Sequence, residues 1–96
     1  MRFGLPDRLI SEIVALARTH GLDRIVLFGS RARGDFRDLS DIDLAVSGGN
    51  VAAFAIDVEE NTQTLLSFDI VDLDGAVQSE LMESIEREGQ TIYEKV

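Results

Sequence analysis

The sequence predicts an α/β fold, with an open β-sheet flanked by helices, within a single domain that spans residues 1–96. Stretches with apolar residues at helical spacing alternate with short apolar stretches that contain β-branched residues, a pattern typical of strands linked through helices. The composition, with 45% hydrophobic residues, 28% charged residues and one proline, is that of a packed domain. A chain of 96 residues can build one hydrophobic core and is too short for two.

The first half of the chain is expected to contain a helix, two strands and a short polar connection. Pro6 suits the first turn of a helix, and His20 with Gly21 supplies its end. The apolar run before Gly29 is β-branched and uninterrupted by polar residues, which favours a buried strand. We expect a helix over residues 5–20, a strand over 24–28, one or two helical turns within 30–38 and a strand over 42–46.

The second half continues this alternation and is expected to end in an edge strand. Asn50 follows two glycines and is a good N-cap, Asp74 can cap a further helix, and Gly89 can end it. Apolar residues recur at helical spacing in both helices. We expect a helix from residue 51 to about 64, a strand over 67–73, a helix between 74 and 89 and a strand over 91–93.

The composition also excludes several classes of function. The chain has no cysteine, which rules out disulfides, thiolate zinc sites and cysteine nucleophiles. Its formal charge of −9 argues against broad nucleic-acid binding, because that affinity comes mainly from neutralising phosphates. The longest apolar runs are far below the roughly 18 residues of a membrane span, and no signal-peptide layout is visible, so we expect a cytoplasmic protein without membrane contact.

Two aspartates are expected on one face of the second strand. Side chains alternate along a strand, so Asp41 and Asp43 share one face while the apolar residues between and after them share the other. At roughly 3.3 Å per residue their Cα atoms lie about 6–7 Å apart, close enough for both carboxylates to lean onto one divalent ion or a pair of ions. Without a cation these carboxylates would repel each other. The plainer interpretation is a solvated strand end.

A third carboxylate, Asp69, begins the next apolar strand, where packing gives no reason for a charge. If the two strands are neighbours, Asp69 converges with the other two aspartates. Oxygen ligands in this number suit Mg²⁺, which usually completes its shell with water and substrate phosphates. The three aspartates therefore predict a nucleoside triphosphate nearby.

The Gly29-Ser30 step lies between the first strand and the short polar connection. A glycine lets a phosphate approach the backbone, and free N–H groups and the Ser30 hydroxyl can donate to it. Arg31, Arg33 and Arg37 add positive charge, although Arg37 is equally well explained as a surface counterion to its acidic neighbours. Phosphate donors and metal-binding carboxylates thus occur within about twenty residues, the arrangement that nucleotide chemistry needs.

These residues resemble a known signature. The stretches Gly29-Ser30-Arg31-Ala32-Arg33-Gly34 and Ser40-Asp41-Ile42-Asp43-Leu44 are similar to the motif of minimal nucleotidyltransferases of the polymerase-beta superfamily. The resemblance extends to residues 68–73 and 85–93, and Phe36 departs from it by being bulkier than the residue often found there. It implies a small mixed β-sheet flanked by helices, the polymerase-beta-like nucleotidyltransferase fold.

The resemblance also implies a function and assigns the site. Chains this short are similar to the antitoxin of HEPN/MNT toxin–antitoxin modules, which implies Mg²⁺-dependent transfer of AMP from ATP onto a tyrosine of a HEPN ribonuclease toxin. The residues implied to hold the metal and act in catalysis are Asp41, Asp43 and Asp69, and those implied to bind the nucleotide are Gly29, Ser30, Arg31, Arg33 and Ser40.

Other interpretations remain open at this stage. The chain could neutralise a partner by binding alone, with catalysis dispensable, or could be a nucleotidyltransferase acting on a small molecule. Apolar helix surface left uncovered would favour a protein partner or a homodimer. His20 and Tyr93 are assigned structural roles, and local backbone bonding explains Asp72 and Asp74.

Overall fold

The computed structural model describes residues 1–96 and contains four helices and four strands in alternation. In chain order they are α1 (Asp7–Thr19), β1 (Arg24–Phe28), α2 (Ser30–Arg33), β2 (Ile42–Ser47), α3 (Val51–Asn61), β3 (Phe68–Asp72), α4 (Ser79–Glu88) and β4 (Gln90–Glu94). The predicted order of elements is confirmed. None of the helices is long and apolar enough to cross a bilayer.

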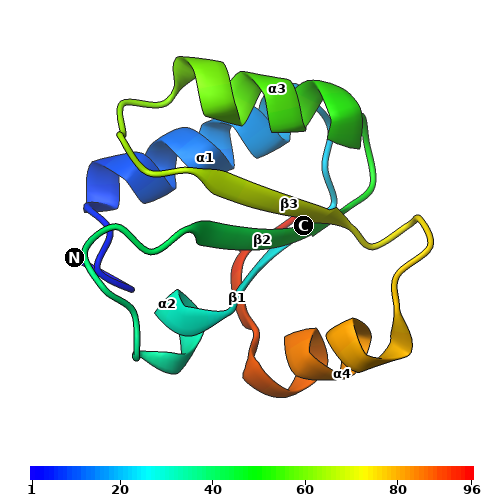
Figure 1. Ribbon diagram of the computed structural model, residues 1–96. Coiled ribbons are helices and arrows are strands. Elements are labelled where there is room, and N and C mark those ends of the chain that lie inside the picture. The colour runs from blue at the N-terminus through cyan, green and yellow to red at the C-terminus, as the bar shows by residue number, and fades with distance from the viewer.

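The strands form one mixed sheet in the order β3-β2-β1-β4. β1 is antiparallel to both β2 and β4, whereas β2 and β3 are parallel and α3 makes the crossover between them. The predicted small mixed sheet flanked by helices is therefore confirmed. Figure 1 shows α1 and α3 on one side of the sheet and α2 and α4 on the other.

The face beneath α1 and α3 carries the larger hydrophobic core. Alternate residues of β2, Ile42, Leu44 and Val46, point into it and are fully buried. The same face receives Ile25 and Leu27 of β1. Both helices contribute apolar side chains from one face each: Leu9, Ile10, Ile13 and Ala17 from α1, and Phe54 and Val58 from α3.

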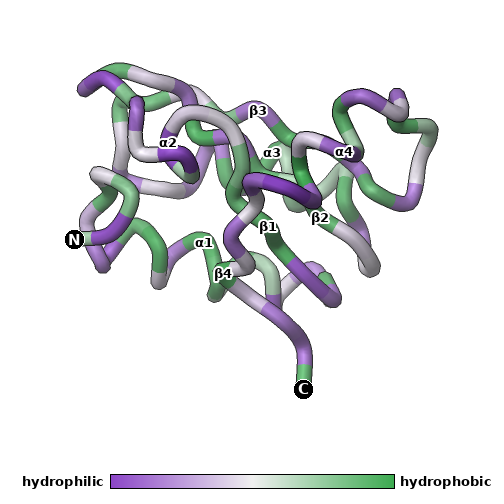
Figure 2. The backbone as a smooth tube through the Cα atoms, turned by 90° about the horizontal axis from the view of Figure 1, so that it is seen from below, coloured by the Kyte–Doolittle hydropathy of each residue, from purple (hydrophilic) through white to green (hydrophobic).

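The opposite face has a smaller core and carries the polar residues of interest. Val26, Phe28 and Ala45 pack there against Ile85 of α4. Asp43 lies two residues before Ala45 in β2, so its side chain is on this same face of the sheet. Figure 2, viewed from below, shows α2 and α4 nearest the viewer on this side, with hydrophilic backbone around α2.

The ends of the first two long helices differ slightly from prediction. α1 begins at Asp7 with Pro6 as its N-cap, and it ends at Thr19 with His20 as C-cap. α3 has the predicted cap, because the Asn50 side chain accepts a hydrogen bond from Ala53 N–H. The helix ends at Asn61, earlier than expected, since Thr62 is extended.

The last helix starts later than the sequence predicts, and the expected role of Asp74 as its N-cap is wrong. The Asp74 carboxylate instead accepts a 2.7 Å hydrogen bond from Gly48 N–H, which ties the end of β3 to the end of β2. Asp72 accepts from the backbone N–H of Asp74, the local bonding that was expected for it. α4 therefore begins only at Ser79, and Gly89 ends it as predicted.

His20 has the structural role that the sequence favours. Its Nε2 lies 2.7 Å from Asp57 Oδ2 on α3, and its ring packs edge-on against Phe54. The hydrogen bond from His20, followed by one from Asn61, lowers the pKa of Asp57. These contacts join the C-terminal end of α1 to α3, away from the aspartates of β2.

Leu44 lies in the centre of the larger core, so its truncation tests this packing. Its side chain is fully buried on β2, and we expect Leu44→Ala to lower the free energy of unfolding by about 3 kcal/mol, measured by urea denaturation. Leu65→Ala is the matched control, because Leu65 is fully exposed and its truncation is expected to change the free energy by less than about 0.5 kcal/mol. Equal losses in the two variants would contradict this core.

Candidate functional site

The three predicted aspartates lie at one end of the sheet, and two of them, Asp43 and Asp69, lie on one face of it. β2 and β3 are paired in parallel with Asp43 opposite Asp69, so both side chains leave the sheet on the same side. Asp41 immediately precedes β2 and lies close enough to Asp43 for its charge to act on that carboxyl. Asp43 is half-buried, whereas Asp41 and Asp69 are exposed. The structure thus places the three carboxylates near one another at this end of the sheet, and their joint binding of a metal stays a prediction.

The electrostatics of Asp43 reflect this crowding. Burial contributes most to raising its pKa, and the neighbouring carboxylates of Asp69 and Asp41 raise it further. Arg33 and Arg31 act in the opposite direction and only partly offset these effects. The free protein therefore holds excess negative charge at this point, which favours the binding of a cation.

Gly29 lies directly against the carboxylate of Asp43. It follows Phe28, which is paired with Asp43 across the β1–β2 ladder. A Cβ at Gly29 would overlap Asp43 Oδ2 and lie 3.0 Å from Asp43 Cγ. The backbone there has φ 75° and ψ −157°, a conformation that only glycine adopts readily. Both backbone conformation and space therefore require glycine at this position.

The chain turns at Gly29 into α2, which starts with Ser30 beside the aspartates. The first N–H groups of a helix have no acceptor within it, and those of α2 begin next to Asp43. The N–H groups of Arg33 and Gly34 are the first to bond back, to the carbonyls of Gly29 and Ser30. The N–H groups before them and the half-buried Ser30 hydroxyl remain the predicted phosphate donors.

Arg31 occupies a different position from the one predicted for a nucleotide ligand. It is the only buried charged residue, 2% exposed, and its guanidinium donates to backbone carbonyls. Burial lowers the pKa of this guanidinium, with Asp38 and Asp43 acting in the opposite direction. The side chain thus points into the protein and donates to the backbone, whereas its contact with phosphate stays a prediction.

Arg33 and Ser40, two further predicted nucleotide ligands, lie near the site with partners of their own. Arg33 is exposed and bonds Asp35 at 3.2 Å and Glu88 of α4 at 3.0 Å, and these bonds raise its pKa, Glu88 more than Asp35. The Ser40 hydroxyl accepts from Arg37 N–H at 2.8 Å. Their binding of nucleotide stays a prediction.

The donor set fits a hard divalent cation. Asp41, Asp43 and Asp69 offer only carboxylate oxygens, the ligands that Mg²⁺ prefers. No three His, Asp or Glu side chains are close enough together to hold an ion by themselves. Mg²⁺ is commonly bound by one or two carboxylates with water and substrate phosphates, so an open arrangement of this kind suits it.

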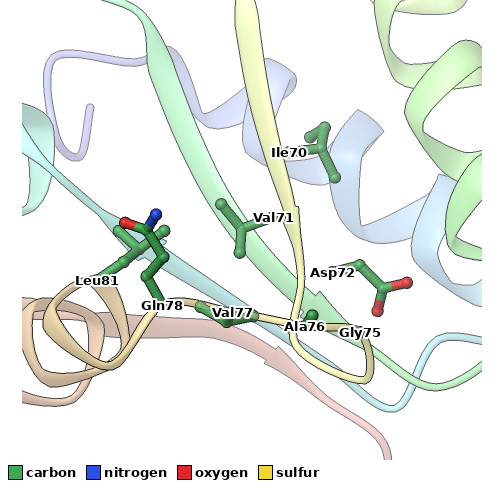
Figure 3. A pocket seen from close by; sticks show the side chains of 8 residues that line it. All are labelled: Ile70, Val71, Asp72, Gly75, Ala76, Val77, Gln78 and Leu81. Carbon is green, nitrogen blue, oxygen red and sulfur yellow. The ribbon is translucent and has the colours of Figure 1, made fainter.

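The structure has one cavity, of about 360 Å³. It lies between β3 and the segment that leads into α4, and Figure 3 shows Val71 and Leu81 at its wall. Val71 shares a face of β3 with Asp69, two residues earlier, although no predicted site residue lines the cavity. The site itself is an open surface between α2, β2 and β3.

Comparison with known families decides the relationship that this geometry suggests. Residues 11–96 match the family described as Polymerase beta, Nucleotidyltransferase. The chain belongs to this family. Its Gly29-Ser30 step and its strand aspartates lie inside the matched region. A comparison with curated proteins gives no match.

Solved structures support the same relationship. A minimal nucleotidyltransferase of known structure has a TM-score of 0.70 and 29% identity, with 94% of this chain and 95% of that chain covered. A toxin–antitoxin crystal structure with AMP-PNP has a TM-score of 0.73 and 26% identity over 90% and 73% of the two chains. A variant of the toxin–antitoxin MntA-HpeT has a TM-score of 0.69 and 26% identity, with 88% of this chain and 72% of that chain covered. The polymerase-beta-like fold is confirmed.

The sequence does not reveal two contacts that shape the site of this nucleotidyltransferase domain. Glu88 binds Arg33 across more than fifty residues of chain, and no local sequence pattern predicts that pair. Phe36 was noted only for its size; its ring stacks on the guanidinium of Arg31, 4.9 Å away. A bulky aromatic residue five positions after an arginine was the one available signal.

Proposed function

We propose that the chain is an Mg²⁺-dependent nucleotidyltransferase that transfers AMP from ATP to a tyrosine hydroxyl of a HEPN ribonuclease toxin, and so acts as its antitoxin. The observation that carries the proposal is the placement of Asp43 opposite Asp69 and against Gly29. Membership in the nucleotidyltransferase family supports the reaction class. The similarity to a toxin–antitoxin structure with AMP-PNP supports the nucleotide and the biological setting.

The residues divide the work between phosphate and metal. N–H groups at the start of α2 and the Ser30 hydroxyl bind phosphate oxygens of the nucleotide, and Gly29 permits their close approach. Asp41 and Asp43, with Asp69, hold the divalent cation. When bound, Mg²⁺ neutralises charge on the triphosphate and on the transition state. Exposed Arg33 adds a further positive charge at the edge of the site.

The transfer needs a nucleophile in line with the leaving group. The tyrosine oxygen of the partner attacks the α-phosphorus, the bond from that phosphorus to the bridging oxygen breaks, and pyrophosphate leaves. Asp69 is exposed and accepts the hydroxyl proton of the incoming tyrosine. Positioning and charge neutralisation supply most of the acceleration, because the protein contributes no covalent step.

The proposal is tested with purified proteins and mass spectrometry. The chain is incubated with ATP, Mg²⁺ and a purified HEPN ribonuclease toxin, and the mass of each protein is measured. We expect the toxin to gain one or more AMP units on tyrosine and to lose ribonuclease activity. Controls omit Mg²⁺, or replace the modified tyrosine by phenylalanine.

The alternative functions give different results in the same experiment. Neutralisation of the toxin in a stable complex with no mass change, even with ATP and Mg²⁺, would indicate a binding module. Consumption of ATP only when a small hydroxylated compound is added would indicate a small-molecule transferase. Either outcome would overturn the proposed protein modification.

A further inference from the structure

The buried arginine of α2 fastens two separate backbone segments. Nη1 of Arg31 donates to the carbonyls of Phe3 at 3.0 Å and Gly4 at 3.4 Å. Nη2 donates to Asp38 O at 3.2 Å and Ser40 O at 3.0 Å, and Nε also donates to Ser40 O at 3.1 Å. The planar fork of a guanidinium can reach both segments at once, which a single ammonium group cannot.

Aromatic and glycine contacts hold this guanidinium in place. The ring of Phe36 stacks on it, with the Cζ atom of Arg31 4.9 Å from the ring centroid. A Cβ at Gly4 would overlap the Phe36 ring and lie 2.9 Å from Nη1 of Arg31. The N-terminal segment, closed by a bridge between Arg2 and Leu5, thus packs tightly over the arginine. This side chain has little freedom to leave for a ligand.

Two of the hydrogen bonds of Arg31 reach the backbone directly before Asp41. The Ser40 carbonyl, which accepts two of them, belongs to the peptide that joins Ser40 to Asp41. Arg31 itself follows Ser30 in α2. The same side chain therefore links the start of α2, where phosphate is expected to bind, to the backbone that carries the first aspartate.

Burying a charge without a carboxylate partner is costly, so this arrangement calls for a reason. We propose that Arg31 is a positioning residue: it holds the loop of residues 34–41 against α2 and so sets Asp41 in place facing the Gly29-Ser30 step. It touches neither nucleotide nor metal. This inference rests on the proposed function, since it assigns to Arg31 the geometry of that same site.

The test compares Arg31→Gln and Arg31→Lys with Arg18→Gln as a matched control, since Arg18 is exposed on α1 and makes no side-chain hydrogen bond or ion pair. Amide hydrogen exchange is measured first. We expect exchange at Ser40 and Leu5 to accelerate at least about tenfold in both Arg31 variants relative to β1 and β2, and to be unchanged in the control. Unchanged exchange in folded Arg31 variants would overturn the fastening role.

Binding of Mn²⁺ with a non-hydrolysable ATP analogue is measured next by electron paramagnetic resonance. We expect about tenfold weaker Mn²⁺ binding in both Arg31 variants, because Asp41 loses its fixed position, and wild-type binding in the control. Equal affinity in folded Arg31 variants would overturn the inference. If the wild type binds no Mn²⁺, the proposed function fails, and the exchange data still decide whether Arg31 holds the loop.

If neither Arg31 variant folds, NMR of the wild-type protein tests whether Arg31 is held in place. The Nε–H proton of Arg31 should then be resolved by NMR, exchange slowly with water and show close contacts to the Phe36 ring. A guanidinium that exchanges rapidly and reorients freely would contradict the proposal.

Discussion

Replacing Asp43 by asparagine is expected to abolish the proposed AMP transfer while making the free protein more stable. Asparagine keeps the shape of the side chain but removes the charge that binds a cation, and we expect transfer to fall at least about 10³-fold, or about 4 kcal/mol of transition-state stabilisation. Asp41→Asn is expected to cause a similar loss of activity. Transfer is measured by the mass of the partner protein over time.

The gain in stability follows from the crowding of carboxylates at this point. Asp43 lies opposite Asp69 and near Asp41, and like charges placed opposite each other destabilise a sheet. We expect Asp43→Asn to raise the stability of the free protein by about 0.5 kcal/mol at pH 7, which for a domain of this size is about 2–4 °C in Tm. Loss of function with gain of stability is the mark of a functional site.

The effect of Asp43→Asn should depend on pH in a defined direction. The pKa of Asp43 in the folded protein is raised above its ordinary value of 3.8, so the folded state disfavours the ionised form. Below the unfolded pKa the carboxyl is protonated in both states and the penalty is absent. The penalty grows as pH rises and is complete above the folded pKa. The stability advantage of Asp43→Asn should therefore be absent below the unfolded pKa of the carboxyl and full above its raised folded pKa.

A charge-matched variant separates this local effect from the overall charge. Glu60→Gln also removes one negative charge, from an exposed position on α3, and is expected to leave both Tm and transfer unchanged. Added Mg²⁺ with an ATP analogue should raise the Tm of the wild type and not that of Asp43→Asn. An asparagine variant that is less stable than wild type at pH 7 would contradict the electrostatic account.

Adding a single methyl group to the site is expected to reduce stability and nucleotide binding most at Gly29, in the variant Gly29→Ala. The alanine must adopt a backbone conformation reserved for glycine, and its Cβ must displace the Asp43 carboxylate. We expect a loss of about 2–4 kcal/mol in the free energy of unfolding, by urea denaturation, together with at least tenfold weaker binding of ATP analogues.

Gly34→Ala provides the matched control, because Gly34 also has a positive φ, of 90°, but a Cβ there would meet nothing within 4 Å. Its cost is backbone strain alone, about 1 kcal/mol, and nucleotide binding should be retained. The excess cost at Gly29 should shrink by about 1 kcal/mol in the Asp43→Ala background, as a double-mutant cycle would measure. Additive losses would show that the two positions do not interact.

The parts of the fold that local patterns specify were predicted well. Helices and strands came out in the correct order because hydrophobic periodicity and caps such as Asn50 act within a few residues. The start of α4 was wrong because the Asp74 carboxylate binds Gly48, a residue brought near only by the parallel pairing of β2 and β3. A capping residue and a long-range acceptor look the same in a sequence.

The sequence by itself determined that Asp43 lies on the face of β2 opposite Ile42 and Leu44 and that Gly29 and Ser30 follow a buried strand, because alternation and chain order are local properties. Only the tertiary structure decided that Asp69 lies beside Asp43, since this depends on which strands pair. It also turned Arg31 inward onto carbonyls of Phe3 and Ser40. A guanidinium binds whatever acceptors the fold brings within reach, and only folding brings distant carbonyls to it.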